Sequence, residues 1–331
     1  MLRPWVDFVS ARQAVSALLL FTAVLGRADH SVIANEPAPL NVTRLLKVFR
    51  AEFVDITPGS GKFPQTFSMG SANGPDNEQP PHTVKFEYDF SIAKYEVPQN
   101  LYEAVMEANP SRWKGPRNSV EEVSWTQAAE FCRRVTKLLR AADLIGQNDE
   151  VRLPSEAEWE YCCRAGTTTE FSFGPTATGP DDRGSAASLL DEYGWHTANA
   201  AGNDPPVGAK KPNGWGLYDM HGYLSEYVSD GWHDNYHDAP ANGRSWTNAD
   251  DKTQRLTRGG SWRDHYSLLR SAARRKTSSA AQSDAVGFRC VKAGVPDQNA
   301  ELRVRQKQRV GQFSSRRFRL CQDPSRVFEV I

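Results

Sequence analysis

The stretch from Arg258 to Cys290 limits most strongly what this chain can fold into. It opens with the paired glycines Gly259 and Gly260 and closes with the sequence Gly-Phe-Arg-Cys. Adjacent glycines reach backbone conformations that other residues avoid, so the pair predicts a tight turn. The residues between the two ends are mostly polar. They predict a long surface excursion before the chain returns to a core.

The composition supports a folded, loop-rich domain and gives no charge signal for a particular partner. The chain has 331 residues, of which 39% are hydrophobic and 10% aromatic, enough for a sizeable core. Nine Trp, 24 Gly and 20 Pro residues predict a fold with much loop, in which aromatic side chains supply much of the buried area. Forty basic residues balance 40 acidic ones, so the net charge does not favour a nucleic-acid or acidic-surface partner.

An apolar run near the N-terminus predicts export. The run from Ala14 to Gly26 follows Arg3 and Arg12, as the hydrophobic region of a signal peptide does. It is shorter than the roughly 20 apolar residues that a membrane span usually needs, and a retained anchor is the alternative. We therefore expect an exported protein, periplasmic or secreted, with no membrane span after signal cleavage.

The chain divides into parts of different character. Basic side chains outnumber acidic ones after Val291 and the tail shows no fold signature, so it is expected to be disordered and no nucleic-acid partner is predicted. The expected organisation is a signal peptide over residues 1–28, a linker over 29–50, one folded domain over 51–294 and a basic tail over 295–331.

Capping patterns predict two helices inside the domain. Ser124 and Gln127 form a capping-box pattern ahead of apolar residues at helical spacing. Ser155 and Glu158 form a second one, before a short helix from Glu156 to Arg164. We interpret the glutamates of this short helix as favourable charges at its positive N-terminal end rather than as a catalytic carboxylate pair.

Other segments predict short strands and loop. Alternating and β-branched residues predict strands within 53–70 and within 83–92, paired in a sheet. A helix is expected to start near Pro98, where a missing N–H costs nothing. Residues 167–213 are rich in Gly, Pro, Ser, Thr and Asp, so they predict a surface loop around a short strand at 193–196.

Three more motifs accompany the paired glycines. They are Phe67-Ser-Met-Gly70, the run from Arg152 to Tyr161 and the run from Pro212 to Asp219. In this order, over about Phe67 to Val291, the chain resembles the formylglycine-generating enzyme, or sulfatase-modifying factor, family. The resemblance implies an α+β fold, a variant of the C-type lectin architecture with small antiparallel sheets, a few helices and much ordered loop.

The copper positions of that family are occupied differently here. Its copper-dependent members oxidise a substrate cysteine to formylglycine with two cysteines that follow the Gly-Gly-Ser turn, and the matching positions are Asp264 and Leu269. A carboxylate suits hard cations and a leucine side chain has no donor atom, so copper is not expected. We assign no catalytic residue and leave open whether the protein is an enzyme; if it is one, we expect an oxidoreductase.

The turn itself is predicted to form the floor of a ligand groove. The candidate groove residues are Ser261, Trp262, Arg263, Asp264 and His265. Asp264 beside His265 also suggests acid–base chemistry, but adjacent side chains on an extended segment point apart, which favours two solvated polar groups.

The resemblance also implies a calcium site and a disulfide. The calcium ligands would be the side chains of Asp219 and Glu226 and the backbone carbonyls of Gly222 and Leu224, all of them the oxygen donors that calcium prefers. Cys132 and Cys290 match a family disulfide. Cys163 matches half of a second one, whose partner position is Ser271, and is therefore expected to be a free thiol.

Two functions from different classes fit these features. The first is a non-catalytic binding or assembly module whose groove recognises a peptide, a glycan or a protein partner. The second is an oxidoreductase that works without the copper cysteines, as the resemblance to family members in pyoverdine maturation implies. We favour the binding module. Redox metal in the purified protein would favour the oxidoreductase.

Overall fold

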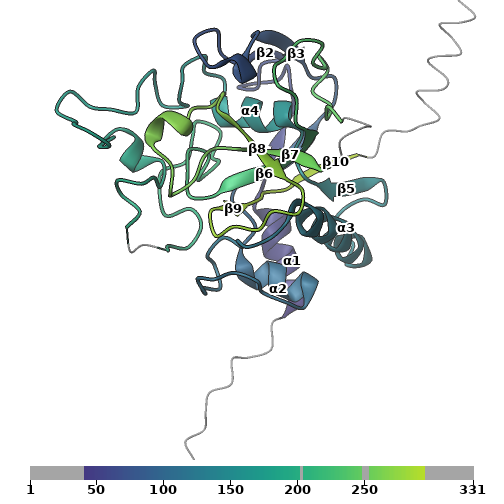
Figure 1. Ribbon diagram of the computed structural model, residues 1–331. Coiled ribbons are helices and arrows are strands. Elements are labelled where there is room, and N and C mark those ends of the chain that lie inside the picture. The colour runs from purple at the N-terminus through teal and green to yellow at the C-terminus, as the bar shows by residue number, and fades with distance from the viewer. Residues whose placement is uncertain (1–40, 202–203, 248–252, 295–331) are drawn as a thin grey trace, which may run out of the picture. The chain divides into compact units, whose positions relative to one another are not determined.

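The computed structural model describes residues 41–201, 204–247 and 253–294 (Figure 1). The predicted signal peptide over 1–28 and the basic tail over 295–331 lie outside these residues. The α-helices of the described part are α1 (Val42–Ala51), α2 (Gln99–Met106), α3 (Trp125–Ala141) and α4 (Glu156–Arg164). Short 3-10 helices span Asp76–Glu78, Leu190–Glu192 and Tyr266–Leu268. None of the described helices has the length and hydrophobicity that a bilayer crossing requires.

Short strands form three small sheets. The strands are β1 (Phe53–Ile56), β2 (Thr66–Met69), β3 (His82–Lys85), β4 (Phe90–Ala93), β5 (Asp149–Arg152), β6 (Ser225–Gly231), β7 (Gln254–Arg258), β8 (Arg274–Ser278), β9 (Val286–Gly287) and β10 (Val291–Gly294). Their orders are β1-β4-β10-β5, β2-β3 and β8-β7-β6-β9, with antiparallel pairing except between β6 and β9. The predicted α+β fold of small antiparallel sheets, few helices and much loop is confirmed.

The strand pairing differs from the sequence prediction in two places. The segments 53–70 and 83–92 each hold parts of two strands, and these pair in separate sheets, β1 with β4 and β2 with β3. Alternation predicts a strand but not its partner, and here the loops inside each segment redirect the chain. The predicted strand at 193–196 is wrong, because this segment has no sheet partner and follows the 3-10 helix Leu190–Glu192.

The helix ends follow the predicted capping patterns. The Ser124 hydroxyl accepts the Gln127 backbone N–H while the Gln127 side chain accepts the Ser124 N–H, and Ser155 and Glu158 repeat this arrangement. The predicted helix from Glu156 to Arg164 has these same bounds in the structure.

The end of the predicted linker is a helix. Residues 42–51 form α1, which starts where the Asn41 side chain accepts the backbone N–H of Arg44. Leu46 and Phe49 of this helix are buried, and α1 packs against α2. Residues 41–50 therefore belong to the folded domain, and the linker prediction is wrong for this part.

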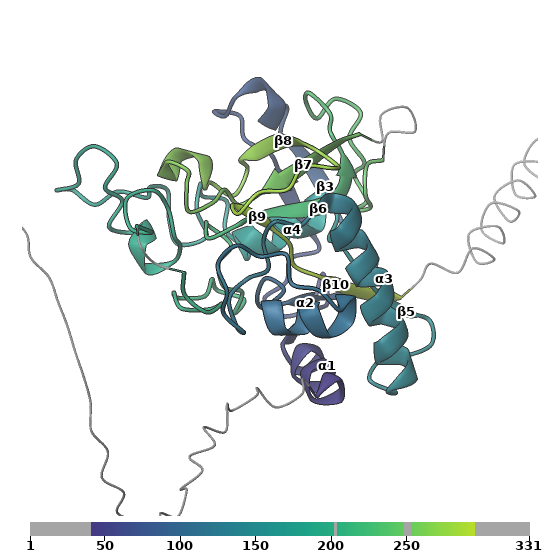
Figure 2. The ribbon, with the colours of Figure 1, turned by 60° about the horizontal axis from the view of Figure 1, so that its bottom comes forward.

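The sheet β1-β4-β10-β5 separates two cores that are rich in aromatic side chains. Successive strand residues point to opposite faces, so Ala93 and Cys290 face one core while Ile92 and Val291 face the other. The first core includes residues of α1, α2 and α3, which lie together in Figure 2. The second includes α4, whose Trp159 is fully buried.

Candidate functional site

The predicted Gly-Gly turn follows β7. Gly259 and Gly260 have φ angles of +88° and +68°. A Cβ atom on Gly260 would lie 2.7 Å from Leu269 Cδ1 and 2.8 Å from the carbonyl oxygen of Leu268. Both the backbone conformation and the space therefore require glycine here. The turn holds the segment that starts at Ser261 tightly against the later part of the excursion.

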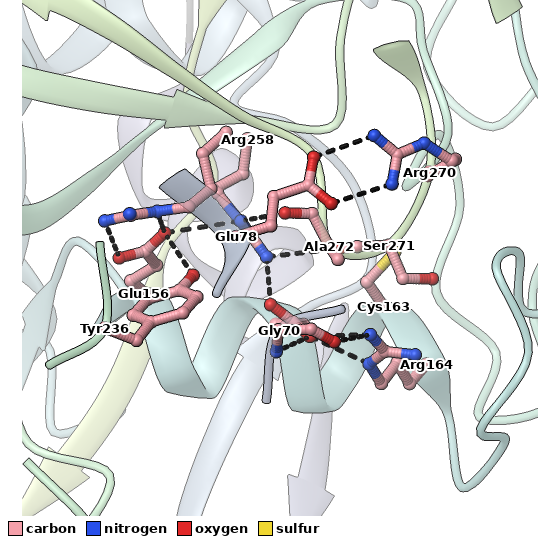
Figure 3. Close-up of polar contacts among 12 residues, drawn as sticks. Gly70, Glu78, Glu156, Cys163, Arg164, Tyr236, Arg258, Arg270, Ser271 and Ala272 are labelled. Atoms are coloured by element: carbon pink, nitrogen blue, oxygen red, sulfur yellow. Dashed lines mark hydrogen bonds and ion pairs between the residues drawn. The ribbon is translucent and has the colours of Figure 1, made fainter. Parts of the chain in front are cut away.

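The side chain of Arg258, the residue before the Gly-Gly turn, anchors the turn to the protein interior. Its guanidinium donates to the carbonyl oxygens of Ser271 at 2.8 Å and Ala272 at 2.9 Å, and it forms an ion pair with Glu160 of α4 (Figure 3). Arg258 and Glu160 are both fully buried, so the pair has given up its hydration and depends on its geometry. The contact fixes Arg258 and residues 271–272 to the same helix, α4.

Arginine partners hold each of the helix α4 glutamates. Glu156 pairs with Arg274, with 2.5 Å between Oε1 and Nε, and Glu158 pairs with Arg152, with 2.7 Å between Oε2 and Nη1. These glutamates and Glu160 are almost completely buried. Side chains bound in this way have a structural role, and none of the three is a free acid or base.

Asp264 closes the turn on itself. Its Oδ2 accepts the backbone N–H of Ser261 at 2.9 Å and the Ser261 hydroxyl at 2.8 Å, while Oδ1 pairs with Arg275 Nη2 at 2.5 Å. Ser261 is fully buried and Asp264 nearly so. Two of the predicted groove residues therefore form the frame behind the surface rather than the surface.

Leu269 is part of an apolar cluster. It is fully buried among Phe171, Ala177, Ala187 and Leu190. The two positions expected to correspond to the family's copper cysteines thus hold an ion-paired carboxylate, Asp264, and an aliphatic core side chain, Leu269. Neither offers a soft donor to copper.

Helix α4 also reaches this region. The Sγ of Cys163 lies 3.8 Å from His221 Nε2, and His221 Nδ1 lies 2.9 Å from the carbonyl oxygen of Leu269. That carbonyl can only accept, so Nδ1 carries the proton and Nε2 accepts the N–H of Ser172. The buried face of the helix, including Cys163, belongs to the second core.

Burial keeps this cysteine and histidine neutral. It raises the pKa of the Cys163 thiol to about 12 and lowers the pKa of His221 to about 4. A thiolate–imidazolium pair would need the opposite shifts. The pair is therefore not an activated nucleophile.

The remaining predicted groove residues lie at the surface. Trp262 is partly buried and donates its indole N–H to the carbonyl oxygen of Asp284 at 3.0 Å. Arg263 lies over the Trp262 ring, 4.7 Å from its centroid, and forms an ion pair with Asp284. His265 turns away from Asp264 and contacts Ser267 Oγ at 2.9 Å, so the two do not form an acid–base pair.

Trp262 forms one wall of a cavity of about 280 Å³. The lining also includes Trp113 and Glu121, which come from a loop far away in the sequence, and Tyr223. Trp113 is 46% exposed, which is unusual for so large an apolar side chain. Of the predicted groove residues, only Trp262 is among those that line this cavity. The contributions of Trp113, Glu121 and Tyr223 were not predicted from the sequence.

The side chains of the predicted calcium site lie in a buried charged cluster. Both oxygens of Glu226 bind Arg289, at 2.6 Å to Nε and 2.6 Å to Nη2, and Oε2 also accepts the Trp159 indole N–H. Asp219 Oδ2 accepts the N–H of Gly208 at 2.8 Å, and Oδ1 is buried without a hydrogen-bond partner.

A third carboxylate, which the sequence did not reveal, belongs to this cluster. Glu96 is buried; it accepts the N–H of Leu224 at 3.1 Å and the hydroxyl of Ser119. Burial and the neighbouring carboxylates raise its pKa well above the usual value, and burial raises that of Asp219 to about 6. Three carboxylates thus share one guanidinium, that of Arg289.

The donor set fits calcium only in part. The free oxygen of Asp219 and the excess of carboxylates favour a hard cation, but Arg289 occupies both oxygens of Glu226. Across the described residues, no three His, Cys, Asp or Glu side chains are arranged to hold a metal ion. Calcium binding by Asp219 and Glu226, with the carbonyls of Gly222 and Leu224, stays a prediction.

Comparison with known proteins identifies the family to which the chain belongs. The family model described as "Sulfatase-modifying factor enzyme 1-like domain" matches residues 51–294. This chain belongs to that family. The predicted recognition is confirmed.

Related sulfatase-modifying factor proteins differ in their described roles. The chain is 29% identical over 206 residues to "Chaperone protein LppX" of Paenibacillus barcinonensis, which covers 53% of this chain and 69% of that protein. It is 30% identical over 199 residues to the formylglycine-generating enzyme of Bos taurus, covering 55% of this chain and 46% of the enzyme. The match thus spans less than half of the bovine enzyme.

Solved structures share the fold. PvdO from Pseudomonas aeruginosa is 26% identical, with a TM-score of 0.60 over 73% of this chain and 94% of PvdO. Treponema denticola variable protein 1 is 24% identical, with a TM-score of 0.59 and the same coverage, and shows the fold alone. These likenesses agree with the predicted C-type-lectin-like fold.

Cys132 and Cys290, which were predicted to form a disulfide, lie close together. The Sγ atoms of Cys132 and Cys290 lie 3.8 Å apart in the first core, where both side chains are buried. They are free thiols in the structure. The distance is longer than the roughly 2.05 Å of a disulfide, yet it needs only a small side-chain adjustment to close. The disulfide stays a prediction.

Proposed function

We propose that this domain is an exported, non-catalytic module that binds a peptide, a glycan or a protein partner in the pocket between Trp113 and Trp262. The observation that carries the proposal is a contrast between two neighbouring regions. The copper positions are closed, because Asp264 is committed to Ser261 and Arg275 and Leu269 is buried. The pocket beside them is open and lined by aromatic side chains, which supply large contact areas at low entropic cost.

A protein partner has support from one relative. LppX is described as a chaperone, a class of protein that binds other proteins. The Arg258 anchor and the Gly-Gly turn make Trp262 a rigid part of the wall, which reduces the ordering cost of binding.

The direct test is an assay for formylglycine. Purified protein is incubated with copper(I), oxygen and a sulfatase-type cysteine peptide, and mass spectrometry follows conversion of the thiol to the aldehyde. We expect no conversion, and we expect the double variant Asp264→Cys, Leu269→Cys to bind copper(I), since it supplies two soft donors. Sustained conversion by the unmodified protein would refute the proposal.

An oxidoreductase without copper cysteines is the second candidate, and the likeness to PvdO over most of that chain favours it. The two candidates differ in metal content. Elemental analysis of the purified protein that found a redox metal in stoichiometric amount would favour the oxidoreductase. Its absence, together with ligand binding in the Trp113–Trp262 pocket, would favour the binding module.

A further inference from the structure

The distribution of charge around the Trp113–Trp262 pocket is one-sided. The charged side chains that line it are acids, namely Glu121, Asp204 and Asp284. Arg112 and Arg263 lie over the rings of Trp113 and Trp262, 4.8 Å and 4.7 Å from the ring centroids, but do not line the cavity.

Asp284 is already neutralised. It is buried and bridges the two arginines, with 3.4 Å between Oδ2 and Arg112 Nη1 and a close contact between Oδ1 and Arg263. The negative charge of Asp284 is therefore used by Arg112 and Arg263. The charge that remains available to a ligand comes from Glu121 and Asp204.

Glu121 has one oxygen without a partner. Its side chain is only 4% exposed; Oε1 accepts the backbone N–H of Trp113 at 3.0 Å, whereas Oε2 is buried with no hydrogen bond. Burial raises the pKa of Glu121, and the backbone N–H groups of Trp113 and Arg112 offset part of this rise. A buried carboxylate oxygen left unpaired is costly, and a donor from a ligand would remove that cost.

The available oxygens favour a compact cation over a planar one. Asp204 uses Oδ2 for Asn118 Nδ2 at 2.6 Å and has Oδ1 3.0 Å from the Tyr223 hydroxyl. Neither Asp204 nor Glu121 can thus offer two free oxygens to the fork of a guanidinium. An ammonium group needs only single contacts, and the faces of Trp113, Tyr223 and Trp262 attract it by cation–π interaction.

We propose that the pocket binds the side chain of a lysine residue from a peptide or protein partner, with the ammonium group donating to Glu121 and the methylene chain between Trp113 and Trp262. The inference rests on the proposed binding function and names the ligand group that this function would use. Asp204 adds a second negative charge at the exposed side of the pocket.

The test compares three small probes by isothermal titration calorimetry on the full-length protein. N-acetyl-lysinamide carries the ammonium group, N-acetyl-norleucinamide has the same apolar chain without charge, and N-acetyl-argininamide carries a guanidinium. We expect the lysine probe to bind at least roughly tenfold more tightly than the norleucine probe, since a charge-assisted hydrogen bond is lost in the latter. The arginine probe should bind more weakly than the lysine probe.

Matched variants assign the effect to the pocket. Glu121→Gln should weaken the lysine probe roughly tenfold and leave the norleucine probe unchanged. Glu122→Gln, which removes the next acid in the sequence but does not line the cavity, should change neither. Asp204→Asn should also weaken the lysine probe, because it removes the second negative charge, and thermal unfolding checks that the altered contacts with Asn118 and Tyr223 leave the domain folded. This variant keeps the test informative if Glu121→Gln misfolds.

Different failures have different meanings. Equal binding of the lysine and norleucine probes, or a preference for the arginine probe, would overturn the lysine inference but leave a ligand-binding pocket. If none of the probes bound at millimolar concentration, the inference would fall and the proposed binding function would lose its main support. Formylglycine production by the unmodified protein would refute the proposed function alone.

Discussion

Glu226 and Arg289 form a bidentate ion pair in which both side chains are fully buried. The guanidinium also donates to the carbonyl oxygen of Tyr218 at 2.8 Å, so the pair joins β6 to the segment before β10 and to the loop that carries Asp219. Its position in the carboxylate cluster makes Arg289 the main positive charge available to Glu96, Asp219 and Glu226.

Removing this guanidinium should destabilise the fold. Arg289→Met leaves Glu226 as an uncompensated buried charge, so we expect the free energy of unfolding to fall by about 3 to 5 kcal/mol in urea denaturation. Lys85→Met is the control, because the Lys85–Glu87 pair is exposed and should contribute under about 1 kcal/mol. A loss below about 1 kcal/mol for Arg289→Met would contradict the assigned role.

Calcium is expected to raise the melting temperature. It would bind Asp219 and Glu226, and a ligand that binds only the folded state stabilises it. The measurement is thermal unfolding with calcium or with a chelator, and the double variant Asp219→Ala, Glu226→Ala should lose the calcium-dependent shift. A full shift in that variant would refute the assignment. No shift in the unmodified protein would mean that Arg289 takes the place of the cation.

Cys132 and Cys290 are expected to form a disulfide in oxidising conditions. Their sulfurs are 3.8 Å apart, and the bridge would close a loop of 290 − 132 = 158 residues. The chain-entropy model gives at most about 4 to 5 kcal/mol for such a loop. Non-reducing peptide mapping after oxidation should find this pair and leave Cys163 free. A bridge between Cys163 and Cys290 would contradict it.

Asp230 should make stability fall as the pH rises through the weakly acidic range. Burial and the nearby Glu156 raise its pKa to about 7, above the ordinary value of 3.8. Between about pH 4 and 7 the folded state therefore holds a proton that the unfolded state has released, so raising the pH costs stability, by at most about 1.4 kcal/mol per pH unit.

The comparison with Asp230→Asn isolates this contribution. The variant cannot titrate, so its free energy of unfolding should fall less steeply than that of the unmodified protein over pH 4 to 7. Urea denaturation at several pH values measures both slopes. Parallel curves would show that Asp230 has an ordinary pKa in the folded protein.

Local features of this chain were predictable, and contacts between distant residues were not. The capping boxes at Ser124 and Ser155 each lie within four residues, so the sequence contains the whole interaction. The helix α1 was missed, because Leu46 and Phe49 become informative only once a core exists to receive them.

The candidate site shows the same division. The resemblance located the turn and the residues at 264 and 269, but only folding places Trp113 and Trp262 at one cavity and Glu96 near Glu226. The interpretation of the helix α4 glutamates as structural needed Arg152, Arg258 and Arg274, which come from other strands or strand ends. No spacing rule joins these residues in the sequence.

The place of β10 has a consequence for synthesis. This strand is formed by residues 291–294, yet it lies between β4 and β5; its Val291 and Ala293 belong to the second core, and Cys290 just before it belongs to the first. Neither core can close until the end of the domain has left the ribosome and its exit tunnel, since a central strand of the sheet is still missing. Chains that stop before residue 291 should therefore remain open to proteases and chaperones, and the domain is expected to complete its fold only after translation of its last strand.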